Sequence, residues 1–301
     1  MPAARRPRLS RTVARACASA AVLALAVACG GTTDGGPSPS PSPSPSTPTG
    51  GTSPTPSTAS PSPTTPSATT TSPSPSPSPT TASPSPTSLP AWLLGQDVRL
   101  VPTTRKVVLL TFDGGGNADG LTKILATLDS KHMLGTFFLT GRWVQAYPAR
   151  AQAIVAAGHV VGNHTMTHPH ATELSDAELT AEVLDAARVI RTVAGVSPKP
   201  WFRFPYGERT SSDIRLLNSL GYVCVSWTVD TLGWLGTSRG TAADVVQRVL
   251  DKLEPGLIVL MHLGSNPDDG TTFDADALGP LIDAIRARGY TFGTVTELLR
   301  A

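Results

Sequence analysis

The chain has 301 residues, with 24 lysine and arginine residues against 22 aspartate and glutamate residues. Five of the arginines lie in the first 28 residues, and without that segment 19 basic residues remain against 22 acidic ones, a formal charge of −3. A slightly acidic chain without a basic cluster has no electrostatic basis for binding nucleic acid, so we exclude nucleic acid as a partner.

The first 28 residues predict an export signal. Arginines precede Ala16–Ala28, an uncharged apolar run that is shorter than the ~20 residues needed to cross a bilayer, which is typical of a signal peptide. Ala26, Val27 and Ala28 resemble a bacterial lipobox, although an ideal lipobox has leucine in place of Ala26. We expect cleavage before Cys29 and lipidation of Cys29, which anchors the protein to the outer face of the cell membrane. The alternative is ordinary cleavage nearby and a secreted protein.

Residues 29–88 predict a disordered tether. Of the 29 prolines, 18 lie between Pro37 and Pro90, among serine, threonine and glycine. This composition cannot bury enough apolar surface to offset the entropy of ordering, and it favours extended polyproline II structure. A lipid anchor and a long polar tether would hold the remaining chain within the cell-wall layer.

Residues 89–301 predict one domain in which strands and helices alternate. In chain order we expect a strand at 106–112, a helix at 119–128, a strand at 135–139, a helix at 148–157, a strand at 159–162, a helix at 175–194, a strand at 201–204, a helix at 211–220, a strand at 222–227, a helix at 241–253, a strand at 257–261, a helix at 274–288 and a strand at 290–292. Ser175 and Glu178 form a capping box for the longest helix. Cys224, within an apolar strand, is expected in the core. Repeated strand-then-helix units predict an α/β fold, a distorted (β/α) barrel of about seven parallel strands.

Polar residues follow these strands, at the barrel edge where catalytic residues gather. They are Asp113, His164, His168, Arg203, Asp230 and His262. Taken singly, each has an ordinary structural interpretation: a helix cap, a carboxylate partner, a turn residue or a core histidine. His164 and His168, four apart, would face one side of a helical turn, a spacing that suits Zn²⁺ but also a solvated or capping pair.

Taken in order, these segments resemble the polysaccharide deacetylase family, which is carbohydrate esterase family 4 or the NodB-homology domain, over about residues 105–295. The matching blocks are Thr111-Phe112-Asp113, His164-Thr-Met-Thr-His168, Arg203-Phe-Pro-Tyr-Gly207, Asp230 with Trp234, and Leu260-Met-His262. The family fold is a distorted (β/α) barrel, in agreement with the strand pattern.

The resemblance implies a metal-assisted hydrolysis. His164 and His168 would bind a divalent metal, Zn²⁺ first and Co²⁺ second, which polarises the carbonyl. Asp113 would be the general base, and His262 the general acid that protonates the leaving amine. Arg203 would keep Asp113 ionised.

The resemblance also implies supporting and substrate-binding groups. Asp230 would orient and charge His262. The backbone N–H of Tyr206 would bind the oxyanion, and Trp234 and Leu260 would form the walls of the acetyl pocket.

Two positions depart from the family pattern. The aspartate that usually follows the base and supplies the third metal ligand is Gly114 here, and the usual second aspartate of the fourth block is Gly233. Either Asp113 turns to become a ligand, or Asn117 or Asp119 reaches into the site, or the site binds metal poorly and turns over slowly.

We favour an active enzyme that removes N-acetyl groups from an amino-sugar polymer of the cell wall, peptidoglycan before chitin-like oligomers. The alternatives are an O-acetyl esterase on xylan and a carbohydrate-binding wall protein with little turnover. We expect a monomer whose partners are the polysaccharide and, through the lipid anchor, the membrane.

Overall fold

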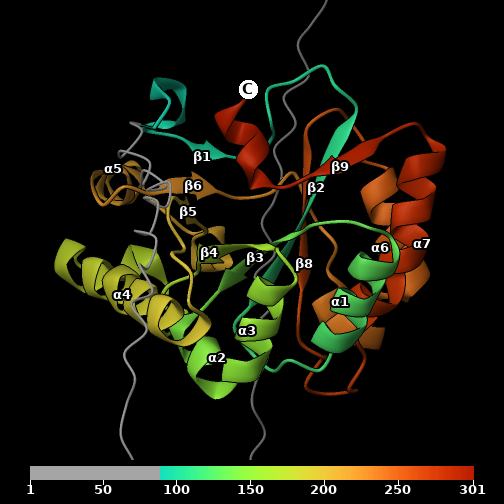
Figure 1. The fold of residues 1–301 in the computed structure, drawn as a ribbon, viewed down its shortest axis with the longest axis horizontal. Helices are drawn as coiled ribbons and strands as arrows, with labels where there is room; N and C mark the ends of the chain where they lie inside the picture. The colour runs from blue at the N-terminus through green and yellow to red at the C-terminus, as the bar shows by residue number, and fades with distance from the viewer. Residues whose placement is uncertain (1–88) are drawn as a thin grey trace, which may run out of the picture. The chain divides into compact units, whose positions relative to one another are not determined.

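The computed structural model describes residues 89–301, which form an α/β fold (Figure 1). The predicted export signal, the lipidation site Cys29 and the tether at 29–88 lie outside the described residues, so these predictions stay expectations. Within residues 89–301, no helix combines the length and apolarity that crossing a membrane requires.

The described part contains a nine-stranded sheet that curls into an open barrel. Its strands are β1 (Asp97–Val98), β2 (Val107–Gly114), β3 (Thr136–Leu139), β4 (Val160–Asn163), β5 (Trp201–Phe202), β6 (Val223–Val225), β7 (Val229–Asp230), β8 (Leu257–His262) and β9 (Thr291–Gly293). Neighbours run β1-β6-β5-β4-β3-β2-β8-β7, with β9 on β2, and the pairings within the sheet are parallel. The predicted parallel, distorted barrel is confirmed. The strands β1 and β7, of two residues each, were not predicted.

Seven α-helices in residues 89–301 cover the sheet. They are α1 (Leu121–Ser130), α2 (Gly141–Ala146), α3 (Pro148–Ala156), α4 (Asp176–Val189), α5 (Ser211–Ser219), α6 (Ala242–Leu250) and α7 (Phe273–Ala287). Helices α1, α6 and α7 lie beside β8, whereas α2, α3 and α4 lie near β3 and β4 (Figure 1). The capping box of Ser175 and Glu178 is present, and α4 passes at Val189 into a π-helical turn that ends before Gly195. The six-residue helix α2 was not predicted.

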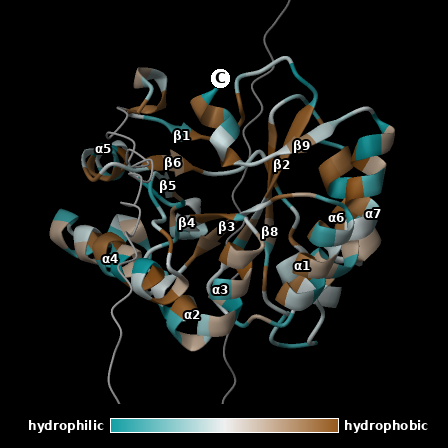
Figure 2. Ribbon diagram, viewed as in Figure 1, coloured by the Kyte–Doolittle hydropathy of each residue, from teal (hydrophilic) through white to brown (hydrophobic). Residues whose placement is uncertain are grey.

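Strand β2 is buried along its whole length, so it reads as a continuous apolar run and not as an alternating one. Leu110 and Phe112 pack with the helices α1 and α7, whereas Val107 and Leu109 face the barrel interior. In Figure 2 the central strands β2, β3 and β8 are largely hydrophobic, and the surrounding helices alternate hydrophobic and hydrophilic residues. Since side chains alternate along a strand, Asp113 shares the interior face with Val107 and Leu109.

Candidate active site

A cleft of about 610 Å³ opens at the C-terminal edge of the sheet, and eight of the nine residues predicted for the site line it. The ninth, Arg203, is fully buried against Asp113. The predicted site residues therefore gather at the strand ends, as the barrel architecture predicts.

The sheet register places the proposed base and the proposed acid side by side. Asp113 on β2 and His262 on β8 are direct partners in the parallel register, and Asp230 on β7 pairs with Leu260 on β8. Asp113 and His262, which are 149 positions apart in the chain, are thereby held on adjacent strands, near the strand ends that border the cleft.

Arg203 binds the carboxylate of Asp113 inside the barrel. Its Nη1 donates to Asp113 Oδ1 at 2.7 Å, and its other donors reach Thr111 Oγ1 at 2.9 Å and the carbonyl of Val225 at 3.0 Å. Burial raises the pKa of Asp113, but the charge of Arg203 and the hydrogen bond that it donates lower it, and the net pKa lies below its ordinary value. Asp113 is therefore ionised at neutral pH and can accept a proton.

His164 and His168 converge through a loop and not through the helical turn that their spacing suggested. Their ring centroids lie 4.8 Å apart, edge to face. Thr165 and His168 adopt left-handed conformations, with φ of 67° and 65°. Such strain persists only where surrounding contacts enforce it, and functional sites concentrate it.

Glu182 on α4 holds this loop in place. Its carboxylate accepts the backbone N–H groups of Met166 at 2.9 Å and Thr167 at 2.8 Å, and the Thr167 hydroxyl at 2.8 Å. Glu182 could not be predicted from the sequence, because a glutamate on an amphipathic helix has the same pattern whether it binds a loop or faces solvent.

Both imidazoles of the pair are neutral. The Nδ1 of His164 donates to the carbonyl of Arg203 at 2.8 Å, which leaves Nε2 unprotonated, 3.4 Å from Asp113 Oδ2. Burial lowers the pKa of His164, and burial with the neighbouring His164 lowers the pKa of His168 to about 4. Neutral imidazole nitrogens are competent metal ligands.

The described residues do not, however, fit the three-ligand site that the family resemblance implies. No group of three or more His, Cys, Asp or Glu side chains in residues 89–301 is placed to hold an ion. A Cβ added at Gly114 would lie 2.9 Å from the Cδ atoms of both Leu139 and Leu263 and 3.4 Å from the Trp143 ring. Apolar side chains thus fill the place of the missing carboxylate, and the closest remaining carboxylate, Asp113, is bound to Arg203.

The two substitutes considered for the third ligand are engaged elsewhere. The Asn117 side chain accepts the backbone N–H of Ser265 at 2.8 Å and donates to its hydroxyl at 3.1 Å. The same hydroxyl donates to Asp119 at 2.6 Å. This network closes the glycine-rich loop against the segment after β8 and does not direct Asn117 or Asp119 toward the histidine pair.

Three carboxylates face His262, and the one in contact was not predicted. Asp274, at the start of α7, lies 3.5 Å from His262 Nδ1, whereas Asp230 accepts the backbone N–H of Leu232 at 2.8 Å. Burial lowers the pKa of His262, but the contact with Asp274 and the charges of Asp113 and Asp230 outweigh it, so the net pKa lies above its ordinary value. His262 is thus suited to donate a proton near neutral pH.

Aromatic rings form the walls of the cleft. Tyr206 is 54% exposed and Trp234 is 45% exposed, an unusual exposure for large rings that is typical of a binding surface. Tyr206 stacks on His170 at 4.2 Å and meets His168 edge-on at 4.6 Å. Trp227, which the sequence pattern assigned to a strand, also lines the cleft, and buried Leu260 lies at its floor.

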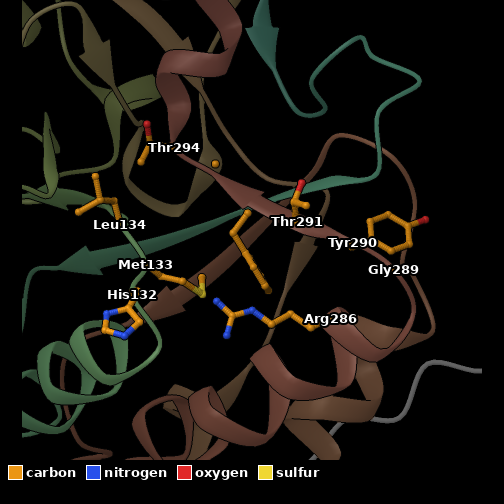
Figure 3. A pocket seen from close by; sticks show the side chains of 10 residues that line it. His132, Met133, Leu134, Arg286, Gly289, Tyr290, Thr291 and Thr294 are labelled. Carbon is orange, nitrogen blue, oxygen red and sulfur yellow. The ribbon is translucent and has the colours of Figure 1, made fainter.

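A second cavity and the free cysteine carry no catalytic arrangement. Another cavity of about 610 Å³ lies beside β9 and the segment before β3 (Figure 3). Its Arg286 donates to the Lys131 carbonyl at 2.8 Å, and none of the predicted site residues line it. Cys224 is free, fully buried in β6 and has a pKa raised by burial, so it is a core residue as expected.

Comparison with known proteins identifies relatives of this domain. The family model described as polysaccharide deacetylase matches residues 101–225. A peptidoglycan-N-acetylglucosamine deacetylase of Bacillus cereus is 31% identical over 199 residues, which are 66% of this chain and 70% of the relative. A chitooligosaccharide deacetylase of Bradyrhizobium is 34% identical over 218 residues, 70% of this chain and 98% of the relative.

Solved structures include a relative described as lacking enzyme activity. A pseudoenzyme of carbohydrate esterase family 4 from Bacillus anthracis is 32% identical, with a TM-score of 0.62 over 68% of this chain and 69% of that chain. A mutant of it, described as having restored enzymatic activity, is 33% identical, also with a TM-score of 0.62, over 68% of this chain and 71% of that chain.

Proposed function

Because this chain belongs to the polysaccharide deacetylase family, which includes hydrolytic deacetylases, we propose that it removes N-acetyl groups from an amino-sugar polymer of the cell wall, with peptidoglycan as the first candidate. The observation that carries the proposal is the direct register pairing of Asp113, which is bound to Arg203, with His262, whose pKa is raised, at one cleft.

The two groups supply complementary proton transfers. Asp113 takes a proton from water as the water oxygen attacks the acetamide carbon, and a C–O bond forms. His262 then gives the proton on Nε2 to the departing nitrogen as the C–N bond breaks, which releases acetate and a free amine. An amine is a poor leaving group without that proton, so the acid is required. The backbone N–H of Tyr206 is the candidate oxyanion donor, and Trp234 and Leu260 are candidate walls for the acetyl methyl group.

The family is generally metal-dependent, and His164 and His168 are the two candidate ligands in this chain. Residues 89–301 place no third ligand beside them, so we propose weak binding of Zn²⁺ or Co²⁺. The lipid anchor at Cys29, the tether and the location outside the cytoplasm are proposed from the sequence.

A second function is favoured by one specific observation. The apolar packing at Gly114 replaces a metal ligand, and a related pseudoenzyme shows that this fold also exists without activity. The second candidate is therefore a wall protein that binds glycan in the aromatic cleft with little turnover. An O-acetyl esterase on xylan would use the same residues.

Acetate release separates these functions. The assay offers N-acetylglucosamine oligomers, peptidoglycan and acetylated xylan to the protein, with added Zn²⁺ or Co²⁺ and with a chelator. Release from the amino-sugar substrates supports the deacetylase. Glycan binding without release under every condition supports the binding protein, and release from xylan alone supports the esterase.

A further inference from the structure

Asp274 is a nearly buried carboxylate that the reaction above does not use directly. It is the second residue of α7, 3% exposed, and its two oxygens have separate partners. Oδ1 accepts the Thr231 hydroxyl at 2.6 Å, and Oδ2 accepts the backbone N–H of His262 at 2.9 Å. A buried carboxylate is costly unless such donors satisfy it, so its orientation is fixed.

The oxygen that binds the backbone of His262 also faces its ring. Oδ2 of Asp274 lies 3.5 Å from Nδ1 of His262, and this nitrogen has no hydrogen-bond partner among the described residues. With Nδ1 turned toward α7, the opposite nitrogen, Nε2, is the one left to serve the cleft that His262 lines. The contact therefore determines which nitrogen can reach a substrate.

Gly233 provides the space for this carboxylate. A Cβ added at Gly233 would lie 2.4 Å from Oδ1 and 2.7 Å from Cγ of Asp274. A side chain at 233 would therefore collide with the carboxylate of Asp274. The place beside position 233, where the fourth block has no aspartate, is thus occupied by a carboxylate from α7.

The other charged groups near His262 are further from its Nδ1 or otherwise engaged. Asp113 on β2 is bound to Arg203, and Asp230 on β7 accepts the N–H of Leu232. The imidazoles of His164 and His168 are neutral, and the ring of Trp234 lies 6.0 Å from that of His262. Asp274 is the carboxylate in direct contact.

We propose that Asp274 is the positioning residue of the general acid: it holds the His262 ring through Nδ1 and the backbone, so that Nε2 presents its proton to the leaving amine. This inference rests on the proposed function.

The test compares Asp274→Asn with Asp276→Asn, which removes an exposed carboxylate two residues further along α7, paired with Lys123. Asp274→Asn is expected to lower kcat about 10–100-fold, a loss typical of removing a carboxylate that supports a functional histidine, with little change in KM. The basic limb of the pH–rate profile should move to lower pH by about one unit. Asp276→Asn should leave both unchanged.

A carboxylate exchange tests the geometry. Gly233→Asp alone should lower activity, because the new side chain collides with Asp274. The double variant Gly233→Asp with Asp274→Ala should be at least about tenfold more active than Asp274→Ala alone. Failure of the pair to improve on Asp274→Ala would overturn the inference.

Titration of His262 by NMR gives a readout that does not need turnover. Its pKa should fall by about one unit in Asp274→Asn and by less in Asp230→Asn. Should Asp274→Asn fail to fold, Thr231→Val, which removes a donor that orients the carboxylate and so lets it turn away from Nδ1, should lower the pKa in the same direction. A pKa that responds to Asp230→Asn but not to the Asp274 or Thr231 variant contradicts the inference. Absence of acetate release by the unmodified protein would sink the proposed function alone, and the titration would still decide the role of Asp274.

Discussion

Arg203 and Asp113 form an ion pair inside the barrel, with Nη1 2.7 Å from Oδ1 and side-chain exposures of 0% and 8%. The guanidinium also lies over the Phe138 ring at 4.2 Å. A charge in this apolar surrounding is tolerated only because the opposite charge is fixed beside it. The pair therefore links the stability of the barrel to the ionisation of the proposed base.

Removing the cation should be costly for folding. We expect Arg203→Met to lower the free energy of unfolding by about 3–5 kcal/mol, because it leaves the Asp113 carboxylate buried and unpaired. Arg188→Met is the matched control, since Arg188 pairs with Asp185 on the surface and should change stability by at most ~1 kcal/mol. Urea denaturation measures the free energy of unfolding of both variants. An equal decrease in the two would show that the buried ion pair contributes no more to stability than the surface pair.

The pH dependence of stability should carry the signature of His262. Its folded-state pKa is raised, so its charged form stabilises the fold fully below the ordinary value of 6.5, and this contribution is lost as the pH rises through the folded-state pKa. Thermal unfolding of the native protein between pH 6 and 9 should show a decline that His262→Gln lacks. An identical decline in the variant would assign the effect to another group.

The missing metal ligand should be recoverable only when the apolar packing is relieved. Gly114→Asp together with Leu263→Ala is expected to tighten Zn²⁺ binding by about tenfold or more, since it adds a carboxylate and removes one of two close Cδ contacts. Gly116→Asp adds the same charge where a Cβ meets nothing within 4 Å. Calorimetric titration compares the three proteins, and equal tightening by Gly116→Asp would mean that charge alone is responsible.

The histidine loop should depend on Glu182. Glu182→Ala removes three hydrogen bonds to residues 166 and 167, and we expect it to lower the free energy of unfolding by about 2 kcal/mol or more and to reduce acetate release. The control Glu173→Ala removes an exposed carboxylate and should stay within ~0.5 kcal/mol. Unchanged acetate release by Glu182→Ala would show that the reaction does not depend on the conformation of the histidine loop.

The sequence was sufficient to place residues at the catalytic edge, because strand periodicity locates strand ends and parallel strands share one edge. It could not supply the loop conformation of Thr165 and His168, because the positive φ angles there occur in a loop whose residues 166 and 167 are held by Glu182 from the distant helix α4.

The contact of Asp274 with His262 could not be predicted from the sequence for a related reason. An aspartate in the first turn of a helix is expected for the helix dipole alone. Only the fold shows that this helix end lies against His262 and that Gly233 leaves room for the carboxylate. Similarly, the effect of Gly114 became clear only once Leu139 and Leu263 were seen beside it.

The most direct test of the acid–base pair is acetate release from N-acetylglucosamine oligomers by His262→Ala, measured together with bound Zn²⁺. We predict that turnover is abolished while the metal content equals that of the unmodified protein, because His262 donates a proton and is not one of the two candidate ligands. Undiminished acetate release by His262→Ala would contradict the account.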